Sequence, residues 1–211
     1  MKVDLAIVGA GPAGIAAATE ARAHGLSVLV LDENTAPGGR IWQAIEARTA
    51  TGEEDRAAQE AVRAFRASGA EARFGASVWG IEPEGRVYWS EEGHARTAEA
   101  AQILLAAGAT ERTMPIPGWT LPGVMTVGAA QIALKTGGLV PEDGVWLAGQ
   151  GPLLLLYAVQ ALAAGGRIAG VLDLSDRGAR RRALRHLPGA LRVPSYLRRG
   201  LSWRLALRRT A

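Results

Sequence analysis

A glycine-rich turn near the start of the chain, set between two apolar segments, limits the fold more than any other feature. Residues 3–8 (VDLAIV) form a short apolar run, and the turn GAGPAG at 9–14 follows at once. An alanine-rich stretch leads to a second apolar run at 27–31, which ends in Asp32 and Glu33. This order of strand, glycine turn, helix, strand and acid is that of a dinucleotide-binding βαβ unit.

Each glycine of the turn has a physical task in such a unit. Gly9 allows the tight turn, Gly11 leaves room for a pyrophosphate beside the backbone, and Gly14 lets the helix lie close to the sheet. The N–H groups at the helix N-terminus then favour phosphate. Asp32, eighteen residues after Gly14, can accept hydrogen bonds from a ribose. The unit therefore predicts a bound dinucleotide but not its identity.

A second pattern of the same kind lies in the second half of the chain. It repeats the order of the first unit, with a strand at 145–148, a turn at 149–152, a helix at 153–164 and a strand at 168–172. Leu154 occupies the third glycine position of the second turn. Asp173 follows Leu154 by nineteen residues, whereas Asp32 follows Gly14 by eighteen. Two interpretations stay open: a second nucleotide site at Gly149, Gly151, Pro152 and Asp173, or a degenerate duplicate that binds nothing.

The remaining patterns complete an α/β organisation. They predict a helix at 53–68, strand pieces at 71–81, a hairpin of 86–90 and 94–98, a short buried strand at 103–108, a Pro/Gly-rich connection at 115–123, a helix at 126–136, and a tail of two helices separated near 188–189 and 194. We predict two Rossmann-like dinucleotide-binding domains, 1–116 for the first cofactor and 117–211 for an incomplete second domain with a basic helical tail.

Composition excludes several classes of protein. The chain has no cysteine, so a flavin–disulfide reductase and a thiolate metal site are excluded, and we predict no metal site. The apolar stretch at 152–164 is too short to span a bilayer, and the N-terminus reads as a core strand rather than a signal peptide. A cytoplasmic protein is expected, with a position peripheral to the inner membrane, as part of a complex, as the alternative.

Charge is strongly segregated along the chain. Residues 1–176 hold 13 Lys/Arg and 20 Asp/Glu, whereas 177–211 hold 11 Arg and no acid, which together give the net charge of +4. Such asymmetry is found in chains that contact nucleic acid or a membrane. We favour the simpler interpretation that the basic tail is a solvated helical segment or one that meets an acidic surface in an assembly. It has few aromatic residues and matches no nucleic-acid-binding motif, so nucleic acid is not an expected partner.

Three stretches carry a resemblance to a known family: LDENTAPGGRIW (31–42), LLAAGATERTMPIPGWTLPGVMTVGAAQ (104–131) and VWLAGQGPLLLLYAVQALAAGG (145–166). They resemble the FAD-binding subunits of bacterial amino-acid and opine dehydrogenases, which are two-dinucleotide-binding-domain flavoproteins. The group includes D-hydroxyproline and proline dehydrogenase alpha subunits, the A-type subunit of opine oxidase, the FAD subunit of hydrogen cyanide synthase and sarcosine oxidase alpha. Members are longer, so the resemblance implies a truncated chain that lacks the segment closing the flavin site.

The resemblance also implies where FAD lies. Its contacts would come from the first turn (Gly9, Gly11, Pro12, Ala13, Gly14), the acids after the second strand (Asp32, Glu33), the second glycine turn (Gly38, Gly39, Arg40) and the end of a later strand (Ala107, Gly108). A second adenine nucleotide or NAD(P) would occupy the 149–152 turn with Asp173.

The implied function is that of an FAD-dependent oxidoreductase subunit in a multi-subunit amino-acid or opine-type dehydrogenase. Such an enzyme oxidises a C–N bond of an amino-acid-like substrate by hydride transfer to the flavin, together with a partner flavoprotein subunit. The alternatives are an NAD(P)H-dependent FAD reductase that passes electrons to a partner protein, and a non-catalytic nucleotide-binding module. None of the histidines, His24, His94 and His186, lies beside a glycine motif, and we assign no catalytic residue.

Overall fold

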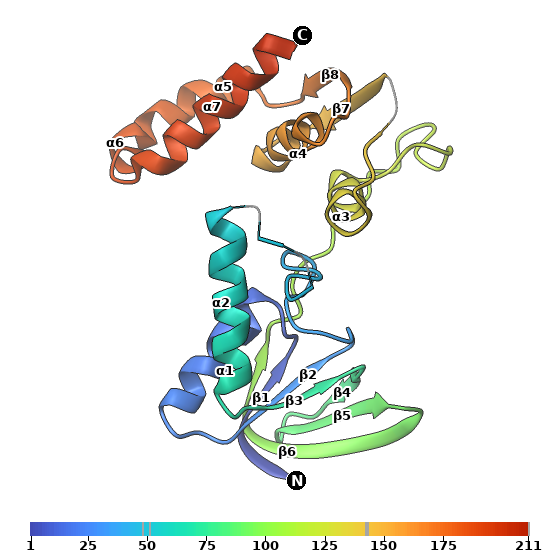
Figure 1. Ribbon diagram of the computed structural model, residues 1–211, viewed down its shortest axis with the longest axis vertical. Helices are drawn as coiled ribbons and strands as arrows, with labels where there is room; N and C mark the ends of the chain where they lie inside the picture. Colours follow the sequence, from blue (N-terminus) through green and yellow to red (C-terminus); the bar gives the residue numbers. More distant parts are fainter. Residues whose placement is uncertain (48, 51, 142–143, 211) are drawn as a thin grey trace. The chain divides into compact units, whose positions relative to one another are not determined.

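The computed structural model describes residues 1–47, 49–50, 52–141 and 144–210. The chain divides into two compact units, Met1–Thr110 and Glu111–Ala211, coloured blue to green and yellow to red in Figure 1. Each unit carries one of the two predicted βαβ patterns, so each is described by itself.

The first unit is built on one six-stranded sheet in the order β3-β2-β1-β6-β5-β4. Its strands are β1 (Lys2–Val8), β2 (Val28–Asp32), β3 (Glu71–Phe74), β4 (Ser77–Ile81), β5 (Arg86–Glu91) and β6 (His94–Leu105). The strands β3, β2, β1 and the second half of β6 run parallel, whereas β4, β5 and the first half of β6 pair antiparallel. The carboxyl ends of the parallel strands therefore meet at one edge of the sheet, where ligands bind in such folds.

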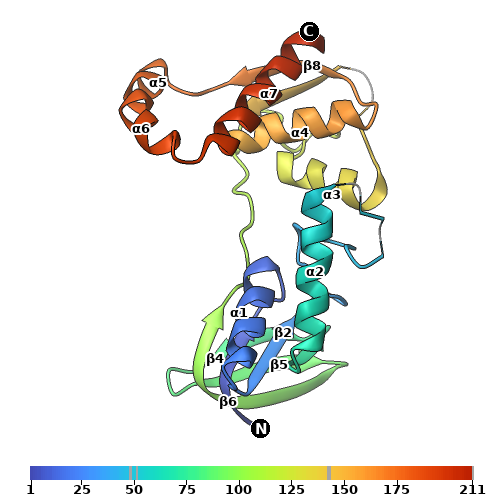
Figure 2. The same cartoon turned by 60° about the vertical axis from the view of Figure 1, so that its left-hand side comes forward.

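The two helices of this unit, α1 (Pro12–Ala23) and α2 (Glu53–Ala67), cover one face of the parallel strands (Figures 1 and 2). Ile15 of α1 and Phe65 of α2 pack with Val30 of β2 in one apolar cluster. The neighbouring residues of β2, Leu29 and Leu31, point to the opposite face and pack with the antiparallel hairpin. Because β2 is buried on both faces, it is apolar throughout except for Asp32 at its end.

The prediction of a separate short buried strand at 103–108 is wrong. β6 is one strand of twelve residues, which pairs with β5 as far as Glu99 and with β1 from Glu99 to Leu105. Beyond Glu99, β1 is the only strand among the described residues that pairs with β6, and Leu104 and Leu105 are exposed, the latter by 66%. The apolar sequence run indicated burial, but a side chain of a strand is buried only where another element packs against its face of the sheet.

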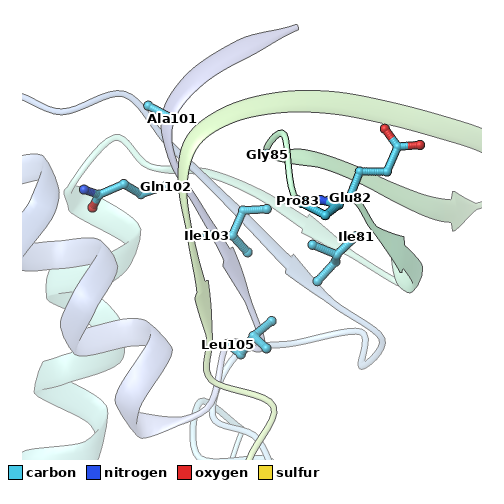
Figure 3. A pocket seen from close by; sticks show the side chains of 8 residues that line it. All are labelled: Ile81, Glu82, Pro83, Gly85, Ala101, Gln102, Ile103 and Leu105. Carbon is cyan, nitrogen blue, oxygen red and sulfur yellow. The ribbon is translucent and has the colours of Figure 1, made fainter.

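A shallow hollow of about 330 Å³ lies beside this open part of β6. Figure 3 shows Ile81, Ile103 and Leu105 directed toward one another in it, while Gln102 points to the opposite side of the strand. Ile103 also packs against the cluster around Leu29 and Leu31, so the hollow is an exposed continuation of that core.

The second unit has a two-stranded parallel sheet of β7 and β8, packed against helices. Its elements are α3 (Val127–Gly137), β7 (Val145–Gly149), α4 (Pro152–Ala163), β8 (Ile168–Asp173), α5 (Arg177–Ala183), the 3₁₀ turn η1 (Leu184–His186), α6 (Leu187–Ala190) and α7 (Pro194–Thr210). The core is formed by Leu147, Leu154, Tyr157, Ala158 and Ala161, with Val127 and Leu134 of α3 packed against it. Burial raises the pKa of the Tyr157 hydroxyl.

The described part of the tail has three helices and a 3₁₀ turn, whereas two helices were predicted. Pro188 and Gly189 do not separate two helices but lie inside the short helix α6, since proline is tolerated in a first helical turn. Pro194 begins α7, as the sequence indicated. None of the helices in the described part of the chain is both long and apolar enough to cross a bilayer.

Candidate functional site

The predicted turn at 9–14 lies where β1, β2 and β6 end. Gly9 has φ +104° and donates its N–H to the Leu31 carbonyl at 2.8 Å. A Cβ at Gly9 would overlap the carbonyl oxygen of Ala106 and lie 3.2 Å from the Cα of Ala107. The turn is thus wedged between the ends of two strands, and only glycine fits at this position.

Gly14 sets the distance between α1 and β1. It is buried, and a Cβ there would overlap the carbonyl oxygen of Gly9 and lie 3.4 Å from the Ile7 side chain. The obstacle is backbone, which cannot move as a flexible side chain does. The helix therefore approaches the strand as closely as the sequence pattern predicted.

A second glycine turn lies against the first. Gly38 donates its N–H to the carbonyl of Ala10 at 2.8 Å, and a Cβ on Gly39 would lie 3.0 Å from the Cα of Gly11. The nearest atom to a Cβ on Gly11 itself is the Gly39 Cα, at 4.0 Å. The two turns form a side-chain-free cradle at the start of α1, and a side chain on Gly11 would project into it. No side chain caps α1 and no acid lies in its first turn, so its amides are available to an anion.

Asp32 is the buried acid of the site, only 5% exposed. Its Oδ2 accepts a hydrogen bond from the N–H of Ala10. Its Oδ1 accepts from the Asn34 backbone at 2.8 Å and from the Asn34 amide at 2.7 Å. These bonds orient the carboxylate beside the turn and leave a lone pair on Oδ2 for a further donor. The hydrogen-bonding roles of Ala10 and Asn34 were missed by sequence reasoning, although an Asp-x-Asn sequence after a strand is a signal for such a local turn.

The other residues that were predicted to contact the cofactor lie around this cradle, and most of them are exposed. Pro12 is the first residue of α1 and is half-buried, and Ala13 beside it is exposed. Glu33, Arg40, Ala107 and Gly108 are exposed, and Gly108 has φ +76° with nothing near a Cβ position. The backbone after β6 is held by the Ala106 N–H, which donates to the Val8 carbonyl at 2.8 Å. The structure therefore brings the glycines and Asp32 together, and leaves Glu33 and Arg40 exposed to solvent.

The second turn has a different construction. Gly149 and Gly151 have φ of +152° and +98°, and Pro152 begins α4. Leu154 is 6% exposed, and its Cδ1 lies 3.6 Å from a Cβ position on Gly149. A leucine thus fills the space under the turn where Gly14 lets helix and strand meet in the first unit. Asp173 is exposed, and its Oδ1 accepts from the Ser175 N–H at 2.9 Å.

The histidines all lie on the surface. His24 contacts Glu20 at 3.0 Å, His94 contacts the Glu92 carbonyl at 2.9 Å, and His186 accepts a hydrogen bond from Arg185 at 3.0 Å. Within the described residues no group of three or more His, Cys, Asp or Glu side chains could hold a metal ion. The first turn thus offers backbone amides suited to a phosphate and a carboxylate suited to a diol, and among the described residues no histidine lies beside it as a general base.

The sequence profile of the pyridine nucleotide-disulphide oxidoreductase family matches residues 3–138 of the chain. Among curated proteins, the A-type subunit of opine oxidase from Rhizobium meliloti is 45% identical over 98% of this chain and 46% of its own length. Hydrogen cyanide synthase subunit HcnB of Pseudomonas aeruginosa is 34% identical over 96% of this chain and 44% of its own length. Among solved structures, L-proline dehydrogenase from P. horikoshii superposes with a TM-score of 0.66, covering 83% of this chain and 36% of that one at 22% identity.

These similarities confirm the predicted family resemblance and the α/β fold class with Rossmann-type nucleotide-binding architecture. The chain spans less than half the length of the curated relatives just described. The division at 116/117 and the individual contact residues stay predictions. The absence of cysteine means that the disulphide in the family's name has no counterpart in this chain.

Proposed function

Because the chain belongs to the pyridine nucleotide-disulphide oxidoreductase family, we propose that it is the FAD-binding part of an oxidoreductase that oxidises a C–N bond of an amino-acid-like substrate. The observation that carries the proposal is the cradle of Gly11, Gly38 and Gly39 beside a buried acid, Asp32. The identities of 45% and 34% to subunits of opine oxidase and hydrogen cyanide synthase support this substrate class and a partner subunit.

The residues present fit FAD by their chemistry. The N-terminal amides of α1 would hold the pyrophosphate, because Gly11 places no side chain between them and the ligand. Asp32 would accept hydrogen bonds from the adenosine ribose, with Glu33 beside it. The Gly38–Arg40 turn and Ala107–Gly108 would lie along the remaining length of the cofactor. When bound, FAD supplies the acceptor for a hydride from the carbon next to the substrate amine.

Flavin binding is tested by absorbance near 450 nm, roughly where an oxidised isoalloxazine absorbs, after FAD is added and the excess removed. The matched variants are Gly11→Val and Gly52→Val, since both glycines precede a helix in extended backbone and neither has a left-handed φ. We expect Gly11→Val to lose FAD and Gly52→Val to retain it. Equal retention of FAD by both variants would contradict a phosphate site at the first turn.

The second nucleotide site is the finer part of the proposal. Gly149, Gly151 and Pro152 would face a second adenine nucleotide or NAD(P), with Asp173 at its ribose. Leu154 under the turn disfavours the close helix–strand contact of the first site, so we propose weaker binding there. Equilibrium dialysis against ATP and NADH, with FAD already bound, measures this directly.

An NAD(P)H-dependent FAD reductase is the second candidate function, favoured by the repeat of the βαβ pattern at β7–α4–β8. Under anaerobic conditions, loss of the flavin absorbance on addition of NADH would support it. Retention of the absorbance with NADH, and its loss with an amino-acid-like substrate when the partner subunit is present, would support the dehydrogenase. A flavin-free chain that binds ATP would indicate a non-catalytic nucleotide-binding module.

A further inference from the structure

The C-terminal helices of the second unit carry a surface that the proposed nucleotide sites do not use. Residues 177–210, termed here the basic segment, contain eleven arginines and no aspartate or glutamate. The acid before it, Asp176, is engaged in capping α5 through the Gly178 and Ala179 amides and in an ion pair with Arg182 at 3.1 Å. The basic segment itself therefore adds only positive side-chain charge to the surface.

The same segment exposes an unusual number of large apolar side chains. On α7, Leu197, Leu201 and Leu205 recur at every fourth position and form a stripe, with Leu201 60% exposed. The other side of α7 faces the core of the unit, where Leu207 packs against the cluster of α4. Further exposed apolar residues are Tyr196 in the first turn of α7 and, before that helix, Leu184, Leu187, Leu191 and Val193.

Arginines flank the leucine stripe and do not lie on a separate face. Arg198 and Arg204 are exposed on α7 between successive leucines, and Arg185 and Arg192 are exposed among the apolar residues before it. If α7 were inserted into an apolar phase, these charges would be buried. A shallow contact would not, because arginine can lay its apolar stem on a surface and extend its guanidinium to phosphate.

We propose that the basic segment docks the protein on an anionic lipid bilayer. A cluster of arginines with interspersed leucines on surface helices matches the headgroup level of such a bilayer, where phosphates and acyl chains are both within reach. Residues 1–176 carry 13 Lys/Arg against 20 Asp/Glu, so the electrostatic attraction to such a surface comes from the basic segment. The contact is peripheral, in accord with the finding that no helix among the described residues is suited to spanning a membrane.

The test is sedimentation of the chain with vesicles of phosphatidylcholine alone or of phosphatidylcholine mixed with phosphatidylserine. We expect binding to the mixed vesicles only, and release as salt is raised. Each arginine at the surface contributes about fivefold to the partition coefficient, so Arg198→Gln with Arg204→Gln should lower it about 25-fold. The control, Arg56→Gln with Arg63→Gln on the exposed side of α2, should leave it unchanged.

A second pair of variants tests the contribution of the apolar side chains to vesicle binding. Leu201→Ser should weaken binding severalfold, whereas Leu139→Ser, which alters a residue 65% exposed elsewhere in the same unit, should not. Far-UV circular dichroism verifies that each variant is folded. Equal binding to both kinds of vesicle, or equal loss in test and control variants, would overturn the proposal. So would a change in oligomeric state of the α7 variants without vesicles, which would assign the surface to self-association.

Discussion

Replacing Gly14 with alanine tests the close approach of α1 to β1 on which the first turn depends. The added Cβ would overlap the carbonyl oxygen of Gly9 and contact Ile7. Because both the helix and the strand end are fixed by packing, α1 has to move away from β1. That movement loosens Ile15 and Ala18, which pack in the apolar cluster beneath the helix.

The expected change in the free energy of unfolding has the opposite sign to the change that helix propensity alone predicts. In an exposed helix, glycine to alanine stabilises by about 1 kcal/mol. Here the overpacking costs about 1–3 kcal/mol, and the upper part of that range applies because the obstacle is backbone. The net effect is a destabilisation of the first unit by about 1–2 kcal/mol. At roughly 4–8 °C per kcal/mol for a domain of this size, its midpoint should fall by about 5–15 °C.

The assay is thermal unfolding followed by far-UV circular dichroism without added nucleotide, so that stability is measured apart from ligand binding. Ala16→Ser is the control, since it adds one heavy atom on the exposed side of the same helix. It should shift the midpoint by far less. A Gly14→Ala variant as stable as the parent chain, or more stable, would refute the close contact between helix and strand.

Three further outcomes follow from other contacts. Asp32→Ala leaves the Ala10 amide without its buried acceptor, which costs about 1–3 kcal/mol by chemical denaturation and weakens FAD binding at least about tenfold in a fluorescence titration. Leu154→Ala leaves a cavity in the second unit and costs about 2–5 kcal/mol, measured by the same denaturation with a probe in that unit. Hydrogen bonds from Ser27 lower the pKa of Asp4 below its usual 3.8, so they stabilise the fold above that pH and their contribution is lost as pH falls through the lowered value. The difference in melting temperature between the parent chain and Ser27→Ala should therefore be present at neutral pH and shrink below about pH 3.8, and a pH-independent difference would contradict this assignment.

Local patterns predicted most elements of the fold, because each pattern is set by residues that lie close in sequence. The amphipathic spacing predicted a helix at 53–68, and α2 ends one residue earlier. The small-residue pattern predicted a helix at 126–136, and α3 begins and ends one residue later. The glycine turn at 9–14 predicted the backbone geometry of a phosphate-binding loop, since no other residue type suits Gly9 or Gly14.

Features that depend on distant neighbours were not predictable in the same way. The apolar run at 103–105 looked buried, but its exposure is set by the pairing of β6 with β1 alone in that stretch. The hydrogen bond from Ala10 to Asp32 joins residues 22 apart and requires β1 and β2 to be in register. Such contacts follow from strand order, which composition and periodicity do not encode.

The central position of β1 in its sheet has a consequence for synthesis of the protein on the ribosome. β1 emerges before both of its neighbours and meets β2 after about twenty residues, yet its other neighbour, the second half of β6, ends at Leu105. At roughly 5–20 residues per second, one edge of this apolar strand stays open for about 5–20 s after it leaves the ribosome. During that interval Lys2 and Asp4 are the only charges on the strand that oppose pairing with another nascent chain. The order of strands in the finished sheet thus leaves β1 open to aggregation during synthesis until the second half of β6 has been made.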